Sequence, residues 1–478
     1  MAITIVGLGP GPVEHMSLAA WRAIEAAEGV YVRTAKHPTV QALPSHVRVS
    51  SFDALYERHD GFEEVYEAIA QEVALLGRKG VVYAVPGHPL VGESSVKRVL
   101  ALAREAEIAV EIVPSESFVS PILVALEVDG LDLQVLDAIE VARCWHPPMR
   151  VDGPALLGQV YDRDTAANVK LTLLNAYPEE HEVVLIRSAG TAEQEVRRLK
   201  LLELDRQPGI DHLTSLFVPP RKAPSSLESF QNTVARLRSP GGCPWDREQT
   251  HQSLRETLLE ETYEVLEALD EEDMDELRAE LGDLLMQICM HAQIAAEAGY
   301  FGIYDVIAGI DEKIRRRHPH VFSDVQVSGS TEVLRNWEEI KRGERGEKDT
   351  RSMLAGVPGG LPALAQANSY QKRVARVGFD WDDIAGVWAK VSEETEELRQ
   401  APPQRREHEL GDLLFAVVNL SRHLGVDAET ALRRANARFR RRFERMQELA
   451  AEQGVDLSKL PLAEQDVYWE RAKDEEGP

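Results

Sequence analysis

The fold of the C-terminal half is decided by the phrases Leu258-Leu259-Glu260-Glu261-Thr262-Tyr263-Glu264 and Glu280-Leu281-Gly282-Asp283-Leu284-Leu285. Leucines recur in them at the spacing of an amphipathic helix, and residues three or four apart share one helix face. Glu261 and Glu264 therefore point one way, as do Glu280 and Asp283. Carboxylates that converge between two helices repel one another unless a cation lies between them, and hard divalent ions such as Mg²⁺ prefer oxygen ligands. The two phrases thus predict a pair of helices that holds a divalent metal ion.

The acidic pattern occurs a second time further along the chain, together with its flanking residues. A single acidic cluster is more often a solvated helix face, but its repetition with the same flanks favours a duplicated site. Basic residues four apart follow each cluster, as Lys313 and Arg317 and as Arg438 and Arg442. The predicted metal ligands are Glu261, Glu264, Glu280 and Asp283 in the first copy, and Glu394, Glu397, Glu409 and Asp412 in the second.

Composition excludes several classes of protein. The chain has 478 residues with 54 basic and 80 acidic side chains, a net charge of −26, which opposes stable binding to nucleic acid. Its three cysteines lack C-x-x-C spacing, so they predict neither a disulfide framework nor a zinc site and fit a reducing compartment. We find no signal peptide and no apolar run long enough to span a membrane. We therefore expect a cytoplasmic protein that does not bind membranes.

Hydrophobic periodicity divides the chain into an α/β part and an all-α part. Short apolar runs alternate with helical patterns at first, which predicts an α/β domain with a largely parallel sheet. The predicted strands lie at 3–6, 30–32, 81–85, 110–113 and 183–187, and the predicted helices at 17–27, 63–76 and 94–105. Long amphipathic patterns dominate later, and Pro-rich or Gly-rich segments separate the parts. We predict an α/β domain at 1–219 and two helical bundles, related by duplication, at 227–345 and 352–478.

Further motifs surround the acidic clusters. They are Gly242-Cys243-Pro244-Trp245-Asp246, Arg316-Arg317-His318-Pro319-His320-Val321-Phe322, Val377-Gly378-Phe379-Asp380-Trp381 and Gly411-Asp412-Leu413-Leu414-Phe415. With these motifs, the half from about 227 to 478 resembles the MazG nucleoside triphosphate pyrophosphohydrolases, all-α enzymes related to the dimeric dUTPases. The resemblance implies hydrolysis of a nucleoside triphosphate to a monophosphate and pyrophosphate, with Mg²⁺ or Mn²⁺, in a homodimer. It implies this role most directly for the second copy and leaves the first copy open.

The resemblance also implies roles for individual residues. A triphosphate is a polyanion, so bound metal ions must offset the charge of the acidic clusters before it can bind. The candidate proton acceptors are Glu260 and Glu393. The candidates for holding the departing phosphates are Lys313, Arg317, Arg438 and Arg442. The residues placed near the nucleotide are Trp337, Lys341, Trp469 and Lys473.

A glycine-rich turn follows the first predicted strand of the α/β half. Gly7-Leu8-Gly9-Pro10-Gly11 permits a close approach of ligand to backbone, although Pro12 stands where the dinucleotide fingerprint has its third glycine. With Val85-Pro86-Gly87-His88-Pro89 and Val113-Pro114-Ser115-Glu116-Ser117, this half resembles the tetrapyrrole (corrin/porphyrin) methylases, which bind S-adenosylmethionine between two α/β lobes. The cofactor-binding residues that the resemblance implies are Gly7, Gly9, Gly11, Pro86, Gly87, His88, Ser115 and Ser117.

Alternatives remain open in both halves. Paired glutamates on helices also build di-iron sites, but those use E-x-x-H motifs, and Asp283 and Asp412 stand at the histidine positions here. All-oxygen ligation favours magnesium or manganese instead. In the α/β half the family's G-D-P is Gly87-His88-Pro89, so this domain is either a methyltransferase or a stabilising or regulatory domain. In the first case the helical half is an oligomerisation scaffold and the protein is an S-adenosylmethionine-dependent methyltransferase.

Overall fold

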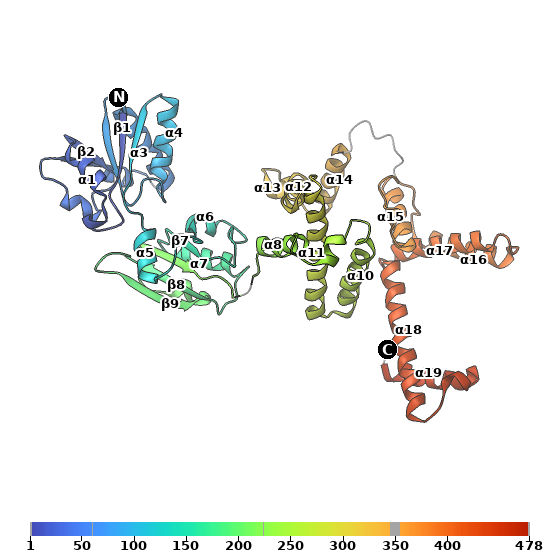
Figure 1. The fold of residues 1–478 in the computed structure, drawn as a ribbon. Helices are drawn as coiled ribbons and strands as arrows, with labels where there is room; N and C mark the ends of the chain where they lie inside the picture. Colours follow the sequence, from blue (N-terminus) through green and yellow to red (C-terminus); the bar gives the residue numbers. More distant parts are fainter. Residues whose placement is uncertain (1, 60, 223, 345–353, 477–478) are drawn as a thin grey trace. The chain divides into compact units, whose positions relative to one another are not determined.

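The computed structural model describes residues 2–59, 61–222, 224–344 and 354–476 (Figure 1). The side chains of residues 331, 334, 338, 341 and 342 lie outside the described part. Contacts divide the chain into two units, Met1–Arg247 and Glu248–Pro478. The first unit is α/β and the second is all-α, which confirms the predicted fold class.

The first unit begins with a parallel sheet of five strands in the order β3-β2-β4-β1-β5 (Figure 1). Its strands are β1 (Ala2–Gly7), β2 (Gly29–Val32), β3 (Arg48–Ser51), β4 (Val81–Val85) and β5 (Ala109–Val113). The helices between them are α1 (Leu18–Glu25), α2 (Asp53–Tyr56), α3 (Phe62–Gly77) and α4 (Ser94–Glu105), with 3₁₀ turns at Val13–His15 and Pro38–Ala42. Apolar side chains of α3 and α4 bury one face of the sheet and those of α1 the other. Burial on both faces explains the continuous apolar runs of these strands.

A second sheet of five strands follows in the order β6-β7-β10-β8-β9, in which only β6 and β7 pair in parallel. Its strands are β6 (Gln134–Asp137), β7 (Ala155–Gly158), β8 (Glu182–Arg187), β9 (Glu195–Lys200) and β10 (Thr214–Val218). Its helices are α5 (Val119–Leu126), α6 (Ala138–Ala142) and α7 (Arg163–Leu173), with a 3₁₀ turn at Leu201–Arg206. Only β8 of this sheet was among the predicted strands. β6, β7 and β10 have only four or five residues, and a short apolar run does not distinguish a strand from a buried turn of helix. β9 is as long as β8, but most of its side chains are charged, so it shows no apolar run.

The predicted linker is docked against the second sheet's lobe. The Arg221 backbone N–H donates to the Val151 carbonyl at 2.8 Å, and its guanidinium donates to the Ala176 carbonyl at 2.8 Å. Ser226 caps the next helix, α8 (Leu227–Arg238), by accepting from the Ser229 N–H at 3.1 Å. These contacts group α8 with the first unit. The domain bounds 1–219, 227–345 and 352–478 stay predictions.

One carboxylate holds this cap, and its loss should destabilise the first unit. Asp152 accepts from the Ser226 hydroxyl at 2.7 Å and from the Ser229 hydroxyl, and the Ser229 bond above all lowers the pKa of Asp152 to about 2 from an ordinary 3.8. We expect D152A to lower the free energy of unfolding by about 1–2 kcal/mol at pH 7. Because the pKa is depressed in the folded state, this contribution is present above about pH 4 and is lost as the pH falls toward 2.

Chemical denaturation of the wild type and of D152A between pH 7 and pH 2.5 measures this difference. D132A is the matched control, because Asp132 forms an exposed ion pair with Arg150 at 2.7 Å and such pairs contribute about 0–1 kcal/mol. A D152A difference that stays constant down to pH 2.5 contradicts the assignment.

The second unit consists of helices, as the long amphipathic patterns predicted. The first acidic copy contains α10 (Arg255–Glu271), α11 (Met274–Glu297), α12 (Ile303–Arg317), α13 (Pro319–Phe322) and α14 (Ser330–Glu344), after the short α9 (Pro244–Glu248). The second contains α15 (Ala363–Ala375), α16 (Ile384–Gln400), α17 (Arg406–His423), α18 (Ala428–Glu452), a 3₁₀ turn at Leu457–Lys459 and α19 (Leu462–Glu476). None of the described helices is both long and apolar enough to cross a membrane.

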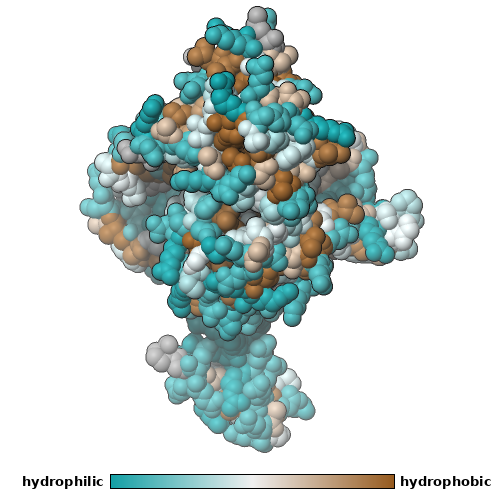
Figure 2. Space-filling view, turned by 90° about the vertical axis from the view of Figure 1, so that its left-hand side faces the viewer, coloured by the Kyte–Doolittle hydropathy of each residue, from teal (hydrophilic) through white to brown (hydrophobic). Residues whose placement is uncertain are grey.

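The surface drawn in Figure 2 is mostly hydrophilic, with hydrophobic residues scattered over it in small groups. This agrees with the net charge of −26. Exposed apolar residues are nevertheless frequent in the helical unit. On α12 they form a stripe of Val306, Ile307, Ile310 and Ile314, each 38–47% exposed. The spacing of this stripe is that of one helix face, so α12 presents an apolar face that the described chain leaves open.

Candidate functional site

The first acidic copy is a helical hairpin whose carboxylates converge. Glu261 and Glu264 of α10 and Glu280 of α11 each place one oxygen within 4.8 Å of the others. Partial burial and the charges of neighbouring acids, among them Asp283, raise the pKa of both Glu261 and Glu280. The structure therefore brings together three of the four predicted ligands of this copy in a cluster of like charges, with the Asp283 charge near enough to raise the pKa of two of them. Such a cluster gains stability when a cation enters it.

The second acidic copy is built in the same way on α16 and α17. Glu394, Glu397 and Glu409 each place one oxygen within 4.8 Å of the others, and Glu409 also groups with Asp412 and His408. Two of these carboxylates are buried, Glu394 being 6% and Glu409 4% exposed. The Oε2 atom of Glu394 is buried without a hydrogen-bond partner among the described residues. An orphaned, buried carboxylate oxygen beside two further carboxylates fits a metal ligand, because metal coordination would satisfy it.

The two copies differ in the cations that surround them. Lys390 Nζ lies 2.8 Å from Oε1 of both Glu393 and Glu394, and these bonds raise the pKa of Lys390. Arg405 contacts Glu409 at 2.6 Å, and His408 contacts Asp412 at 2.9 Å. The first copy has Thr257, Glu276 and Ala279 at the equivalent positions. The second cluster therefore carries its own counter-charge, whereas no ion pair of the described residues reaches the carboxylates of the first.

We expect this difference to appear in thermal stability. In an E397Q background, which disables the second cluster, Mg²⁺ at ten times its dissociation constant should stabilise the protein by about 1.4 kcal/mol through the first cluster. Adding E264Q removes one of the repelling carboxylates, so the metal-free melting temperature should rise and the Mg²⁺-induced increase should shrink. Thermal unfolding with and without Mg²⁺ measures both effects. E271Q is the control, since Glu271 lies on the same helix outside the cluster. Equal responses of E264Q and E271Q contradict the expectation.

The predicted phosphate-binding and nucleotide residues form separate clusters. In the first copy, Lys313 and Arg317 lie on α12, and the Arg317 guanidinium lies 5.6 Å from the centre of the Trp337 ring. Lys341 belongs to α14, but its side chain is outside the described residues. The described contacts do not join this basic cluster to the carboxylates of its own copy.

In the second copy the corresponding residues lie on α18 and α19. The Trp469 ring lies 5.2 Å from that of Phe439 and packs on the small core of Met446, Leu449 and Ala472, so its described role is structural. Lys473 Nζ lies 3.3 Å from Glu470. Arg442 forms an ion pair with Glu476 at 2.5 Å.

Arg438 lines a cavity of about 510 Å³ between α18 and α10 of the first copy. Asp270 of α10 binds Arg433 at 2.6 Å and Arg434 at 3.0 Å, and Glu267 binds Arg440 at 3.1 Å. Ion pairs therefore join the basic helix of the second copy, α18, to the acidic helix of the first, α10. The sequence pattern did not predict this contact, because the residues involved lie outside the repeated motifs.

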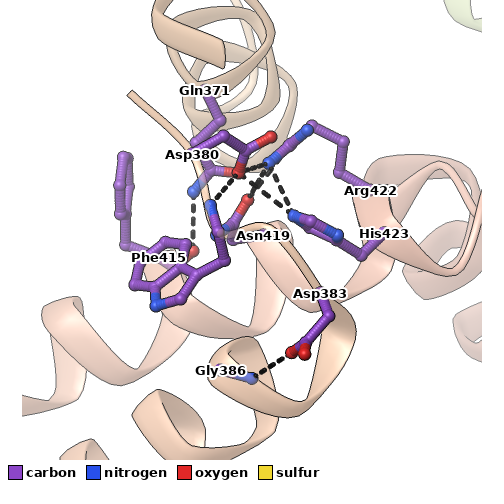
Figure 3. A network of polar contacts seen from close by, with 9 residues as sticks. Gln371, Asp380, Asp383, Gly386, Phe415, Asn419, Arg422 and His423 are labelled. Atoms are coloured by element: carbon purple, nitrogen blue, oxygen red, sulfur yellow. Dashed lines mark hydrogen bonds and ion pairs between the residues drawn. The ribbon is translucent and has the colours of Figure 1, made fainter. Parts of the chain in front are cut away.

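The motif at 377–381 contains a carboxylate, Asp380, that is held by residues of α17 (Figure 3). Asp380 Oδ1 accepts from Arg422 at 2.5 Å and lies 3.1 Å from His423 Nε2, and both partners belong to α17. Asn419 accepts from the same guanidinium at 2.7 Å. These bonds lower the pKa of Asp380, the Arg422 bond contributing most. The network ties the segment before α16 to the end of α17 that is remote from the carboxylate cluster.

The glycine-rich turn of the first unit meets two other loops at the carboxyl ends of the strands. Gly9, with φ of +76°, pairs with Gly87 through N–H to carbonyl bonds of 2.7 and 3.3 Å. The Ser115 hydroxyl donates to the Gly7 carbonyl at 2.7 Å and accepts from the Ser17 N–H at 3.0 Å. The loops after β1 and β4 are therefore joined by their backbones, and the loop after β5 is joined to them by the Ser115 hydroxyl. Gly7, Gly9, Gly87 and Ser115 lie together, and their role in binding a cofactor stays a prediction.

The remaining predicted cofactor residues have local roles. His88 Nδ1 accepts from the Leu90 N–H at 3.1 Å, and Ser117 accepts from the Val119 N–H at 3.2 Å. The Gly11 carbonyl accepts from the buried Thr39 hydroxyl at 2.8 Å. Pro86 lies between β4 and Gly87. His37, which the motifs did not include, is buried beside this turn, and burial lowers its pKa to about 4.

Two family models match the chain. The model described as MazG nucleotide pyrophosphohydrolase domain matches residues 249–322, which contain the first acidic copy. The model described as Tetrapyrrole (Corrin/Porphyrin) Methylases matches residues 2–205.

Similar proteins include relatives of the whole chain and of each half. Uncharacterized protein YabN of Bacillus subtilis (strain 168) is 42% identical over 486 residues, covering 99% of each chain. Nucleoside triphosphate pyrophosphohydrolase/pyrophosphatase MazG of Thermotoga maritima is 47% identical over 248 residues, which are 52% of this chain and 95% of that protein. The crystal structure of uroporphyrin-III-C-methyltransferase from Thermus thermophilus covers 46% of this chain and 94% of its own, with 26% identity and a TM-score of 0.38.

Proposed function

Because this chain belongs to the family of YabN-like fusions between a tetrapyrrole methylase domain and a MazG pyrophosphohydrolase region, we propose that it hydrolyses nucleoside triphosphates to monophosphates and pyrophosphate with Mg²⁺. Mn²⁺, which accepts the same oxygen ligands, is the alternative ion. The reaction assigned to the relative from Thermotoga maritima, as its name states it, supports the proposal.

The observation that carries the proposal is the orphaned oxygen of Glu394. Its Oε1 atom binds Lys390 at 2.8 Å, whereas Oε2 is buried beside Glu397 and Glu409 without a described partner. Burial of an unsatisfied carboxylate oxygen costs free energy, so its retention in the fold indicates a ligand that is absent from the chain itself. We therefore assign catalysis to the second copy, with Glu394, Glu397, Glu409 and Asp412 as the residues that would hold the metal.

Each side chain of the second copy then has a chemical role. Bound Mg²⁺ supplies the positive charge that lets a polyanionic substrate approach the carboxylates and makes its coordinated water more acidic. Glu393, which is exposed and shares Lys390 with Glu394, is placed to accept the proton of the attacking water. Arg438 and Arg442 hold the two phosphates that leave as pyrophosphate, because guanidinium groups match phosphate oxygens.

The separation of carboxylates and arginines within each copy supports a homodimer. The carboxylate hairpin and the basic helix of one copy meet through few contacts, and α12 leaves its apolar stripe exposed. A second chain that covers this stripe could bring a basic helix to each hairpin. The proposal thus includes a site completed by association.

A panel of canonical and damaged nucleotides tests the proposed activity. The full-length protein is incubated with each NTP and dNTP and Mg²⁺, and pyrophosphate, orthophosphate and monophosphate are quantified separately. Equal amounts of pyrophosphate and monophosphate without orthophosphate support the proposal. Orthophosphate with a diphosphate, or no turnover of any nucleotide, refutes it.

A second candidate function, S-adenosylmethionine binding, is favoured by the joined loops of the first unit. The backbone bonds between Gly9 and Gly87 and the bond from the Ser115 hydroxyl to the Gly7 carbonyl build a cradle at the strand ends. Glycines in such a cradle let a ligand approach the main chain closely. Calorimetric titration with S-adenosylmethionine tests this function, and absence of heat at millimolar ligand rejects it. The competing interpretation is that the domain stabilises or regulates the helical half.

A further inference from the structure

In the second copy, one glutamate bridges two consecutive arginines. Glu476 of α19 accepts from the Arg441 Nη2 at 3.0 Å through Oε1 and from the Arg442 Nε at 2.5 Å through Oε2. Arg442 and Glu476 are largely covered, with 21% and 27% of their side chains exposed. The carboxylate thus fixes both guanidinium groups at once.

The first copy repeats this arrangement with its own residues. Glu344 of α14 accepts from the Arg316 Nε at 2.9 Å through Oε1 and from the Arg317 Nη2 at 2.5 Å through Oε2. It accepts from the Arg317 Nε at 3.2 Å as well. Only 17% of the Arg317 side chain and 20% of Glu344 are exposed. In both copies the first arginine therefore binds Oε1 of the glutamate and the second binds Oε2, although the donor nitrogens differ and Arg317 also reaches Oε1.

The recurrence is also present in the sequence. Glu344 lies three residues after Lys341, and Glu476 lies three residues after Lys473, so the repeated pattern is W-x-x-x-K-x-x-E. An isolated surface ion pair has little energetic value. A carboxylate that bridges two guanidinium groups is stronger, because both of its oxygens accept charge-assisted bonds. These bonds lower the pKa of Glu344 to about 2, so it stays ionised at any pH used for an assay.

We propose that Glu344 and Glu476 are positioning residues for phosphate binding, which hold Arg317 and Arg442 in the orientation that receives the departing pyrophosphate. The inference rests on the proposed function, since it takes these arginines as phosphate ligands. In the second copy Glu476 binds Nε of Arg442, so both terminal amino groups of this guanidinium lie outside the contact, whereas in the first copy Glu344 binds both Nε and Nη2 of Arg317. In the first copy the Trp337 ring also lies against one face of the Arg317 guanidinium. A guanidinium fixed in advance loses less entropy when phosphate binds.

Binding of inorganic pyrophosphate to the full-length protein tests the proposal without requiring turnover. Calorimetry with Mg²⁺ present compares the wild type with the double variant E344Q/E476Q. The matched control is D311N/E475Q, which removes ion pairs of the neighbouring arginines: Arg315 Nε to Asp311 and Arg445 Nε to Glu475, both 2.7 Å. We expect E344Q/E476Q to bind pyrophosphate about tenfold more weakly than the wild type, and the control to bind it normally.

Thermal unfolding distinguishes a positioning role of the two glutamates from a purely structural role, in which they only hold two helices together. If the glutamates only join helices, both double variants lose a few degrees of melting temperature and neither loses pyrophosphate affinity, which overturns the proposal. Tighter pyrophosphate binding by E344Q/E476Q also overturns it, because the glutamates then compete with phosphate. If the wild type binds no pyrophosphate at millimolar concentration, the proposal is overturned as well. A different result would separate the two proposals. If no nucleotide of the panel is hydrolysed but the wild type binds pyrophosphate and E344Q/E476Q binds it more weakly, the proposed hydrolysis is rejected and this inference stands.

Discussion

Substitution of Glu397 by glutamine is expected to reduce pyrophosphate release about a thousandfold. Glu397 is exposed and makes up the carboxylate triad with Glu394 and Glu409, so the change removes a metal ligand without disturbing a buried ion pair. Loss of metal-ion charge stabilisation corresponds to several kcal/mol of activation free energy, and each 1.36 kcal/mol is about a factor of ten in rate. The measurement is a pyrophosphate-release assay at saturating Mg²⁺, with circular dichroism to verify folding.

The matched control is E396Q on the same helix. Glu396 pairs with Arg399 at 3.3 Å and accepts from Gln400 at 2.7 Å, and it does not belong to the triad. E396Q should retain wild-type activity. E264Q, the equivalent change in the first copy, should reduce activity far less than E397Q. If E264Q abolishes release and E397Q does not, catalysis belongs to the first copy. Full activity of the E264Q/E397Q double variant would show that neither copy catalyses the reaction.

Substitution of Gly7 by alanine is expected to destabilise the first unit by about 3 kcal/mol. A Cβ at this position would lie 2.6 Å from the Gly87 carbonyl oxygen, 2.9 Å from Pro89 Cδ and 3.0 Å from Ser115 Cβ. The nearest of these atoms is backbone, which cannot move aside as a flexible side chain can. Overpacking of this kind typically costs about 1–3 kcal/mol, and the backbone clash places G7A at the upper end.

Hydrogen exchange of peptides from the parallel sheet measures this loss separately for the first unit. Protection of β1 and β4 should fall in G7A, since both strands end at the affected loops. G241A serves as the control, because a Cβ at Gly241 would meet nothing within 4 Å. Protection factors in G7A that match those of G241A would show that the loop junction can open at little cost. The assumed rigidity of the cradle would then be wrong.

The sequence was most informative where a regular pattern repeats. The spacing of leucines and glutamates in α10, α11, α16 and α17 predicted helices with carboxylates on one face, and the structure contains those helices. It also brings three of the four predicted carboxylates of each copy within 4.8 Å of one another, although their function as metal ligands stays a prediction. The α/β character of the first half was confirmed as well. Four strands of its second sheet were missed, because β6, β7 and β10 are too short to show a period and β9 consists mostly of charged residues.

The sequence pattern was least informative about partners that lie on another helix. Glu476 could have been found from the repeated W-x-x-x-K-x-x-E, but the pattern does not state which arginines it binds. Lys390 lies four residues before Glu394 on the same helix, a spacing that predicts their ion pair, but the burial of Glu394 cannot be read from that spacing. Trp469, expected near the nucleotide, packs in a small core. These assignments depend on distances between helices, which local periodicity does not contain.

The amino-acid sequence by itself determined the two fold classes, the duplication and the faces on which acidic residues gather, because helix and strand periods fix the direction of side chains along one element. Only the tertiary structure decided which charges of different helices meet. It paired Asp270 of α10 with Arg433 and Arg434, and Glu476 of α19 with Arg441 and Arg442, whereas the described residues place no cation on the first cluster. The physical reason is that Coulomb energy depends on separation in space and on burial, and both are set by how helices pack against one another.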